Sequence, residues 1–83
     1  MTIHRKVKRV IDGDTFEVSR KIQGTDRIRM AELNAPETYQ FGGERATEKL
    51  KRQIHGKTVT LQPVARSYGR IVAKVRVRGR LIK

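Results

Sequence analysis

Two short acidic segments of the sequence carry the side chains best suited to chemistry. Asp12-Gly13-Asp14 places two carboxylates on either side of a glycine, and Asn34-Ala35-Pro36-Glu37 places an amide and a carboxylate in a second loop. Acidic residues are scarce, 8 in 83, yet three of them fall in these two segments. Oxygen donors without histidine or cysteine are typical ligands of a hard cation such as Ca²⁺ or Mg²⁺. The segments predict a shared metal site, although Asp-Gly-Asp is also a common turn sequence.

Two arginines complete this constellation. Arg29 lies five residues before Asn34, and Arg70 follows in Tyr68-Gly69-Arg70. A metal ion at one phosphate oxygen, guanidinium groups at the others and a carboxylate that activates water are sufficient for phosphodiester hydrolysis. The arginines contribute most when negative charge accumulates on the oxygens of five-coordinate phosphorus. Taken singly, each arginine of so basic a chain is more simply explained as a solvated surface charge.

The charge of the chain points to a polyanionic partner. Lys and Arg number 20 against 8 Asp and Glu, which gives a net charge of +12. Residues 49–83 contain eleven basic residues and no acidic one. Twelve of the basic residues are arginine, which suits bidentate contacts to phosphate. We therefore expect nucleic acid as the partner, with anionic membrane surfaces and acidic proteins as the alternatives.

Several other classes of protein are disfavoured by composition. The chain has no cysteine, so disulfides and thiolate metal sites are excluded. His4 and His55 lie far apart, without zinc-ligand spacing, and no arrangement of side chains suggests a covalent nucleophile. No apolar run approaches the length of a membrane span. No secretory leader is recognisable at the N-terminus, which predicts a cytoplasmic protein without a membrane partner.

The elements that must position these residues begin with three predicted strands. Residues 7–22 predict a strand, a turn at Asp12-Gly13-Asp14 and a second strand, since apolar and polar residues alternate on both sides of the turn. A hairpin loop at 23–26 leads to a third strand over 27–33, which Pro36 prevents from continuing. Asp14 then follows the first strand, and the second acidic loop follows the third.

The spacing of the apolar residues changes from a strand-like to a helix-like period in the middle of the chain. Ala46, Leu50 and Ile54 recur every four residues, which predicts a helix over about 43–55 that ends before Gly56. Strand alternation returns around Val59 and Leu61, before Pro63, and again over 71–77. One helix among five strands is typical of a mainly β fold (β+α). We therefore expect a single domain, residues 1–83: a five-stranded OB-fold barrel with the helix between strands 3 and 4.

Three segments of the chain resemble the motifs of the staphylococcal nuclease (thermonuclease) family. Val10-Ile11-Asp12-Gly13-Asp14-Thr15-Phe16 resembles its opening signature, and the segment from Arg27 to Thr38 resembles its arginine-rich strand and acidic loop. Tyr68-Gly69-Arg70-Ile71-Val72-Ala73 resembles its later arginine motif. The three motifs occur in the order found in that family, with a predicted helix between the second and third. The resemblance covers roughly residues 7–82.

The resemblance implies a role for each matching residue. Asp14 would be the carboxylate ligand of Ca²⁺, Asn34 stands where the family has a second acidic ligand, and the Ala35 carbonyl would complete the set. Glu37 would activate or orient water, while Arg29 and Arg70 would hold the scissile phosphate. The expected function is Ca²⁺-dependent hydrolysis of DNA or RNA, single strands preferred, leaving a 5′-hydroxyl and a 3′-phosphate. Asp12 would serve the turn.

The basic and aromatic residues around this site predict further contacts to nucleic acid. Lys74, Arg76, Arg78 and Arg80 alternate along the last predicted strand and would form one track for backbone phosphates, or else an ordinary polar face. Tyr68, beside Arg70, would stack on a base.

Two departures from the family keep a second function open. Asn34 replaces an aspartate and removes a negative charge from the calcium site. The chain also ends where family members continue into helices, as a minimal barrel or a truncation would. A bare barrel would expose an apolar face, over Val72 and Leu81, and so favour self-association. The alternative to a nuclease is therefore a non-catalytic OB-fold module that binds nucleic acid.

Overall fold

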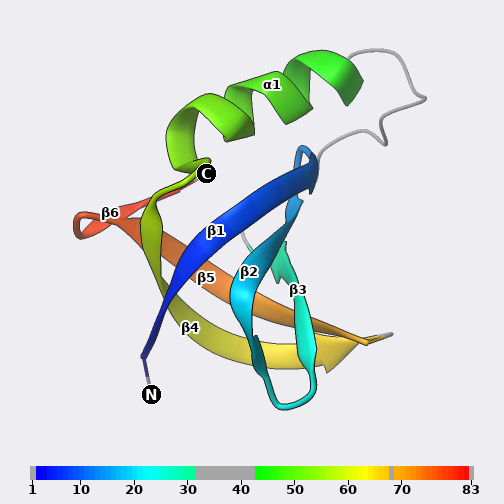
Figure 1. Ribbon diagram of the computed structural model, residues 1–83, viewed down its shortest axis with the longest axis vertical. Coiled ribbons are helices and arrows are strands. Elements are labelled where there is room, and N and C mark those ends of the chain that lie inside the picture. The colour runs from blue at the N-terminus through cyan, green and yellow to red at the C-terminus, as the bar shows by residue number, and fades with distance from the viewer. Residues whose placement is uncertain (1, 32–42, 68, 83) are drawn as a thin grey trace.

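The computed structural model describes residues 2–31, 43–67 and 69–82, and these form a small barrel with one helix across its end (Figure 1). The helix α1 spans Gly43–Ile54 and lies between the third and fourth strands of the chain. The strands are β1 (Ile3–Asp12), β2 (Thr15–Ile22), β3 (Thr25–Met30), β4 (Thr58–Ser67), β5 (Arg70–Val77) and the short β6 (Arg80–Leu81).

The first five strands close into a ring. Their hydrogen-bonded order is β3-β2-β1-β4-β5, and β3 also pairs with β5, so the sheet closes on itself. The closing pair is parallel, with Ile28 opposite Ile71 and Arg29 opposite Val72, whereas the other pairs are antiparallel. The predicted fold class is confirmed: the chain is mainly β, with a closed five-stranded barrel and one helix between strands 3 and 4.

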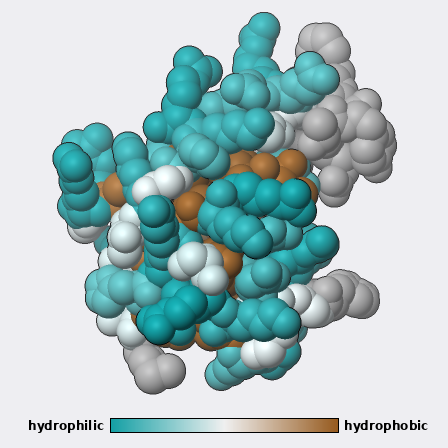
Figure 2. Space-filling model, viewed as in Figure 1, coloured by the Kyte–Doolittle hydropathy of each residue, from teal (hydrophilic) through white to brown (hydrophobic). Residues whose placement is uncertain are grey.

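The interior of the barrel is filled by aliphatic side chains and one phenylalanine. Phe16, Ile28 and Leu61 have no exposed surface, and each lies on a different strand. Outward-facing positions are mostly polar, and in Figure 2 hydrophilic atoms cover most of the visible face, with a hydrophobic band between the helix and the strands. Within the described ranges, no helix is long and apolar enough to cross a membrane.

The helix α1 packs one face on the barrel through the residues that its sequence pattern predicted. Leu50 and Ile54 are 2% and 0% exposed, while Ala46 is half-buried. Glu44 in the first turn and Lys51 and Arg52 in the last turn have the signs that the helix dipole favours. The helix ends at Ile54, and Gly56 follows with a φ of 73°, a left-handed conformation that glycine adopts without steric cost.

Three strands differ from the predicted boundaries. β1 begins at Ile3 rather than at residue 7, because its first residues pair with β4, and β3 ends at Met30 rather than at 33. β3 begins at Thr25 rather than 27, because Gln23 and Gly24 alone form the β2–β3 turn, with φ of 49° and 84° as a two-residue type I′ hairpin requires. β4 continues to Ser67, although its prediction stopped before Pro63. Its ladder to β1 ends at Leu61, so at Pro63 the strand pairs only with β5, where a missing N–H is tolerated.

Two hydrogen bonds tie the β2–β3 turn to the β4–β5 end of the barrel. The Thr25 hydroxyl donates to the Gly69 carbonyl, and the Arg66 guanidinium donates to the Gln23 carbonyl at 2.8 Å. Gly69 directly precedes Arg70, so this link joins the hairpin that carries β3 to the start of β5.

Truncation of a core side chain tests the packing of α1. Ile54→Ala removes a fully buried group, and we expect the free energy of unfolding to fall by about 2–5 kcal/mol. Lys49→Ala, at an exposed position of the same helix, is the matched control and should change it by less than about 0.5 kcal/mol. Urea unfolding followed by circular dichroism measures both. Equal midpoints for the two variants would show that α1 does not pack on the barrel.

Candidate active site

The turn between β1 and β2 holds Asp14 at the edge of the barrel. Asp12 pairs with Thr15 across this turn, and the Asp12 carboxylate accepts a hydrogen bond of 3.2 Å from the Asp14 amide. Asp12 thus shapes the turn, in keeping with its expected role. Gly13 between them is buried, and the Asp14 carbonyl accepts a 2.8 Å hydrogen bond from the Met30 amide. This last bond ties the turn to the end of β3.

Asp14 and Arg29 form an ion pair at this edge. Arg29 Nη2 lies 3.7 Å from Asp14 Oδ2, and the two side chains are 28% and 14% exposed. The Thr15 hydroxyl donates to Asp14 Oδ1 at 3.0 Å. The carboxylate is therefore oriented by a buried threonine and neutralised in part by a guanidinium, yet a part of it faces solvent.

The closure of the ring brings Arg70 to the same outer face as Arg29. Since Ile28 and Ile71 both point into the core, strand alternation turns the flanking Arg29 and Arg70 outward on adjacent strands. Both side chains are half-buried. Within the described residues, Arg70 makes no ion pair of 4.0 Å or less. The structure thus pairs Asp14 with Arg29 and places Arg70 on the outer face of the adjacent strand, two residues before the partner of Arg29.

The other half of the predicted site lies outside the described residues. Asn34, Ala35 and Glu37 fall within 32–42, and Tyr68 is a single position between two described ranges. Their proposed roles stay predictions.

The donors of the β1–β2 turn fit part of a calcium site. Asp14 offers carboxylate oxygens that are accessible to solvent, and oxygen is the ligand atom that Ca²⁺ prefers. Among the described residues, no group of three or more acidic or histidine side chains would hold a metal ion on its own. A complete coordination shell for Ca²⁺ would need oxygen donors from the second acidic loop. The predicted ligand set of Asp14, Asn34 and Ala35 includes two residues of that loop.

An ionic cluster beside this site was missed in the sequence. Glu17 is 8% exposed, and its carboxylate accepts hydrogen bonds from Arg9 at 3.0 and 3.1 Å and lies 3.8 Å from the Arg27 guanidinium. The hydrogen bond and the charge of Glu17 raise the pKa of Arg9. Glu17 stands opposite Arg9 on β1 and Arg27 on β3. The sequence did show Glu17 at an outward position of its predicted strand. Its two arginine neighbours could not be identified, because the pairing of β2 with β1 and β3 is known only from the fold.

The predicted phosphate track stays a prediction, but its four residues do not lie on one strand as expected. Lys74 and Arg76 both face outward on β5, where they pair with positions on β4. β5 ends at Val77, and the chain reverses at Arg78-Gly79, so Arg78 lies in a turn and Arg80 on β6. The two-residue reversal separates them from the track. The apolar positions Val72 and Leu81 are half-buried, and Val64 is 52% exposed, so self-association stays a prediction.

The chain is similar to bacterial proteins named as endonucleases, while no family model matches it. It is 46% identical over 76 residues to an "Uncharacterized endonuclease" of Escherichia coli, across 88% of this chain and 48% of that protein. A counterpart in Escherichia coli O157:H7 is 45% identical over the same length. "Endonuclease YhcR" of Bacillus subtilis is 32% identical over 84 residues, 83% of this chain and 7% of that protein. The chain therefore spans about half the length of the E. coli relatives.

The ionic cluster can be tested by a double-mutant cycle. Arg9→Gln, Glu17→Gln and the double variant should show a clear coupling in the free energy of unfolding, because two hydrogen bonds reach a buried carboxylate. The same cycle on Glu48 and Lys51 is the control, since that helix pair is separated by 3.4 Å and both side chains are exposed. Urea unfolding measures both couplings. A coupling no larger than that of the helix pair would contradict a structural role for Glu17.

Proposed function

We propose that the chain hydrolyses phosphodiester bonds of DNA or RNA with the help of Ca²⁺. The observation that carries the proposal is the Asp14–Arg29 ion pair, with Arg70 outward on the strand beside Arg29, so that a carboxylate and two guanidinium groups would surround a phosphate. The similarity to proteins named as endonucleases supports the same reaction class. The net charge of +12 supports a nucleic-acid substrate.

The proposal includes a family and a type of barrel. We infer that the chain is a staphylococcal nuclease-like domain whose barrel is of the OB type. The ring order, the helix after the third strand and the three sequence motifs support this assignment. Single strands are the preferred substrate in this view, as the resemblance to that family implies.

The residues divide the chemistry among them. Asp14, Asn34 and the Ala35 carbonyl would hold Ca²⁺, which when bound supplies positive charge to a phosphate oxygen. Glu37 takes a proton from water, and the water oxygen forms a bond to phosphorus. The bond from phosphorus to the 5′-oxygen breaks, and that oxygen takes up a proton to leave as a hydroxyl, with the phosphate on the 3′ side.

The two arginines act on the charge that develops during this exchange. Arg29 is already paired to Asp14 at 3.7 Å, which fixes its orientation beside the predicted metal ligand. Arg70 makes no ion pair among the described residues, and in this proposal its guanidinium contacts the phosphate. Guanidinium groups placed in advance stabilise the additional negative charge without reorganisation of solvent.

A second function is supported by one residue. Asn34 carries no charge where a second acidic ligand is expected, which weakens the attraction of the site for Ca²⁺. A barrel that binds nucleic acid without cleaving it is the alternative.

Replacement of the proposed base separates the two functions. Glu37→Gln should lower the rate of single-stranded DNA cleavage in Ca²⁺ by about 10²–10⁴-fold, because the amide cannot accept the proton of water. Affinity for the same DNA in chelator should be unchanged. Glu48→Gln, exposed on α1, removes the same charge and should keep full activity. Absence of cleavage by the unaltered chain at any Ca²⁺ concentration would favour the binding module.

Restoration of the acidic ligand tests the metal site. Asn34→Asp adds a carboxylate, so the Ca²⁺ concentration that gives half-maximal cleavage should fall, on the order of tenfold. Asp14→Asn should move it in the opposite direction. Calcium titration of the cleavage rate measures both. An unchanged midpoint in the two variants would mean that neither residue binds the metal.

A further inference from the structure

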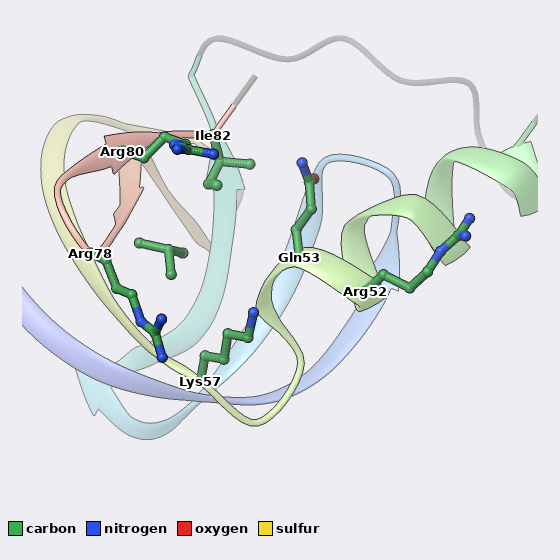
Figure 3. Close-up of a pocket in the computed structure, with 7 residues that line it drawn as sticks. Arg52, Gln53, Lys57, Arg78, Arg80 and Ile82 are labelled. Atoms are coloured by element: carbon green, nitrogen blue, oxygen red, sulfur yellow. The ribbon is translucent and has the colours of Figure 1, made fainter.

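A basic cleft lies between the last turn of α1 and the β5–β6 hairpin, away from the Asp14 turn. It has a volume of about 470 Å³, and its lining comes from two segments that are distant in the sequence. Arg52, Gln53 and Lys57 line it from the helix side, and Val77, Arg78, Arg80 and Ile82 from the hairpin side. Figure 3 shows Arg80 and Ile82 on one side of the cleft, with Arg78 and Lys57 on another.

We propose that this cleft is a second nucleic-acid contact, which binds backbone phosphates of a strand that extends beyond the scissile site. The proposal takes from the proposed function only that the ligand is a nucleic acid. It goes beyond it, because the described residues of the proposed catalytic site, Asp14, Arg29 and Arg70, do not line the cleft.

The first argument is the charge of the lining. Lys57, Arg78 and Arg80 are exposed cations on one cleft, with Arg52 on its rim, and none of the described residues that line it is acidic. Among the described residues, none of these four makes an ion pair of 4.0 Å or less. Like charges held together raise the free energy of the empty cleft, and an anion bound between them lowers it.

The second argument is the backbone at Arg78. Val77 pairs with Arg80, so Arg78 and Gly79 alone form the turn, with φ of 52° and 80°. This is the geometry of a type I′ hairpin, in which the first position favours asparagine, aspartate or glycine. Arginine there is disfavoured by its Cβ, as Gln23 is at the same position of the β2–β3 turn, and within the described part of the fold its side chain makes no ion pair of 4.0 Å or less. The turn thereby places the Arg78 guanidinium at the mouth of a basic cleft, which supports a binding role.

The third argument is that the cleft is lined by both charged and apolar side chains. Val77 is half-buried and Ile82 is 7% exposed, so apolar surface lies beside the cations. The Ile82 amide donates to the Val75 carbonyl at 2.8 Å, which holds this apolar surface against β5. A nucleotide presents both a charged phosphate and apolar sugar and base faces, whereas an isolated phosphate ion presents charge alone. The volume lies in the range of sites that hold molecules of nucleotide size.

The position of the cleft suits a strand that also occupies the catalytic edge. The end of β1, at Val10 and Ile11, faces the first half of α1 through Glu44 and Thr47, whereas the cleft lies at the other end of the helix. A helix of 12 residues is about 18 Å long, so a strand of a few nucleotides would span the two sites. Sites of this kind on small barrels extend over about 4–16 nucleotides.

The test compares two triple variants of equal net charge. The cleft variant is Lys57→Gln, Arg78→Asn and Arg80→Gln, in which asparagine suits the turn and keeps the hairpin folded. The control variant is Lys8→Gln, Arg20→Gln and Lys21→Gln, all exposed on β1 and β2. Circular dichroism and urea unfolding establish that both are folded. Binding of a single-stranded oligonucleotide of about 12 residues is measured in chelator, over a series of salt concentrations.

We expect the cleft variant to bind on the order of 100-fold more weakly at about 0.1 M salt, and the salt slope to fall by about 2, as the loss of three phosphate contacts requires. The control variant should keep the slope of the unaltered chain. An equal loss in both variants, or no loss in either, would overturn the proposal. Because no cleavage is measured, the result is independent of whether Glu37 acts as a base.

Two further probes distinguish nucleic acid from other anions. Inorganic phosphate should compete with the oligonucleotide only at millimolar concentration or above, since it lacks the sugar and base. A polyglutamate peptide with a similar number of charges should bind much more weakly than the oligonucleotide. If the peptide binds as tightly, and loses as much affinity in the cleft variant, the cleft recognises charge alone and the proposal fails.

Discussion

The parallel pairing of β3 with β5 is the constraint on which the rest of the molecule depends. Without it the strands would form an open sheet with two free edges, and Arg29 and Arg70 would lie on opposite edges of that sheet. With it, Ile28 and Ile71 enter one core and the neighbouring arginines share one face. The same closure buries the interior on all sides, which a chain of 83 residues needs in order to fold on a small apolar core.

Two of the few acidic side chains, Glu17 and Asp14, form ion pairs with arginines of the neighbouring strands. Glu17 is surrounded by Arg9 and Arg27, and Asp14 is paired with Arg29, so the carboxylates of β2 and its turn offset the arginines of the neighbouring strands. Residues 49–83 contain no acidic residue to do the same. The cations of this segment therefore line β5 and the cleft beside β6 without an ionic partner from the same segment. The asymmetry of charge along the sequence becomes an asymmetry of charge across the surface.

Sequence patterns predicted the fold class and the helix well because these depend on local periodicity. The four-residue repeat of Ala46, Leu50 and Ile54 marks the buried face of α1, whatever the helix packs against. Boundaries that depend on the neighbouring strand were less predictable. Pro63 looks like the end of a strand, but it lies where β4 has a neighbour on one side only. The reversal at Arg78 was hidden because arginine is not a typical turn residue.

The candidate site was predictable only where its residues belong to local sequence motifs. Asp14, Arg29 and Arg70 belong to recognisable motifs, and the structure pairs the first two and places the third on the neighbouring strand, whereas Glu37 and Asn34 lie outside the described residues. The cluster around Glu17 was not predicted, nor was the cleft that Arg78 and Arg80 share with Lys57, because each is assembled across strands or between a helix and a hairpin. Such sites depend on the register between strands and on the packing of segments that are distant in the sequence. Neither can be predicted from the residue pattern of a single strand.

The link between the β2–β3 turn and Gly69 has a mechanical consequence. Through Thr25 and Arg66, the loops at that end of the barrel are joined by contacts in addition to the strand ladder, which restrains the position of β3 relative to the start of β5. The backbone positions of Arg29 and Arg70 are thus set when the protein folds, so a ligand between the two strands would not have to bear the entropy cost of arranging them.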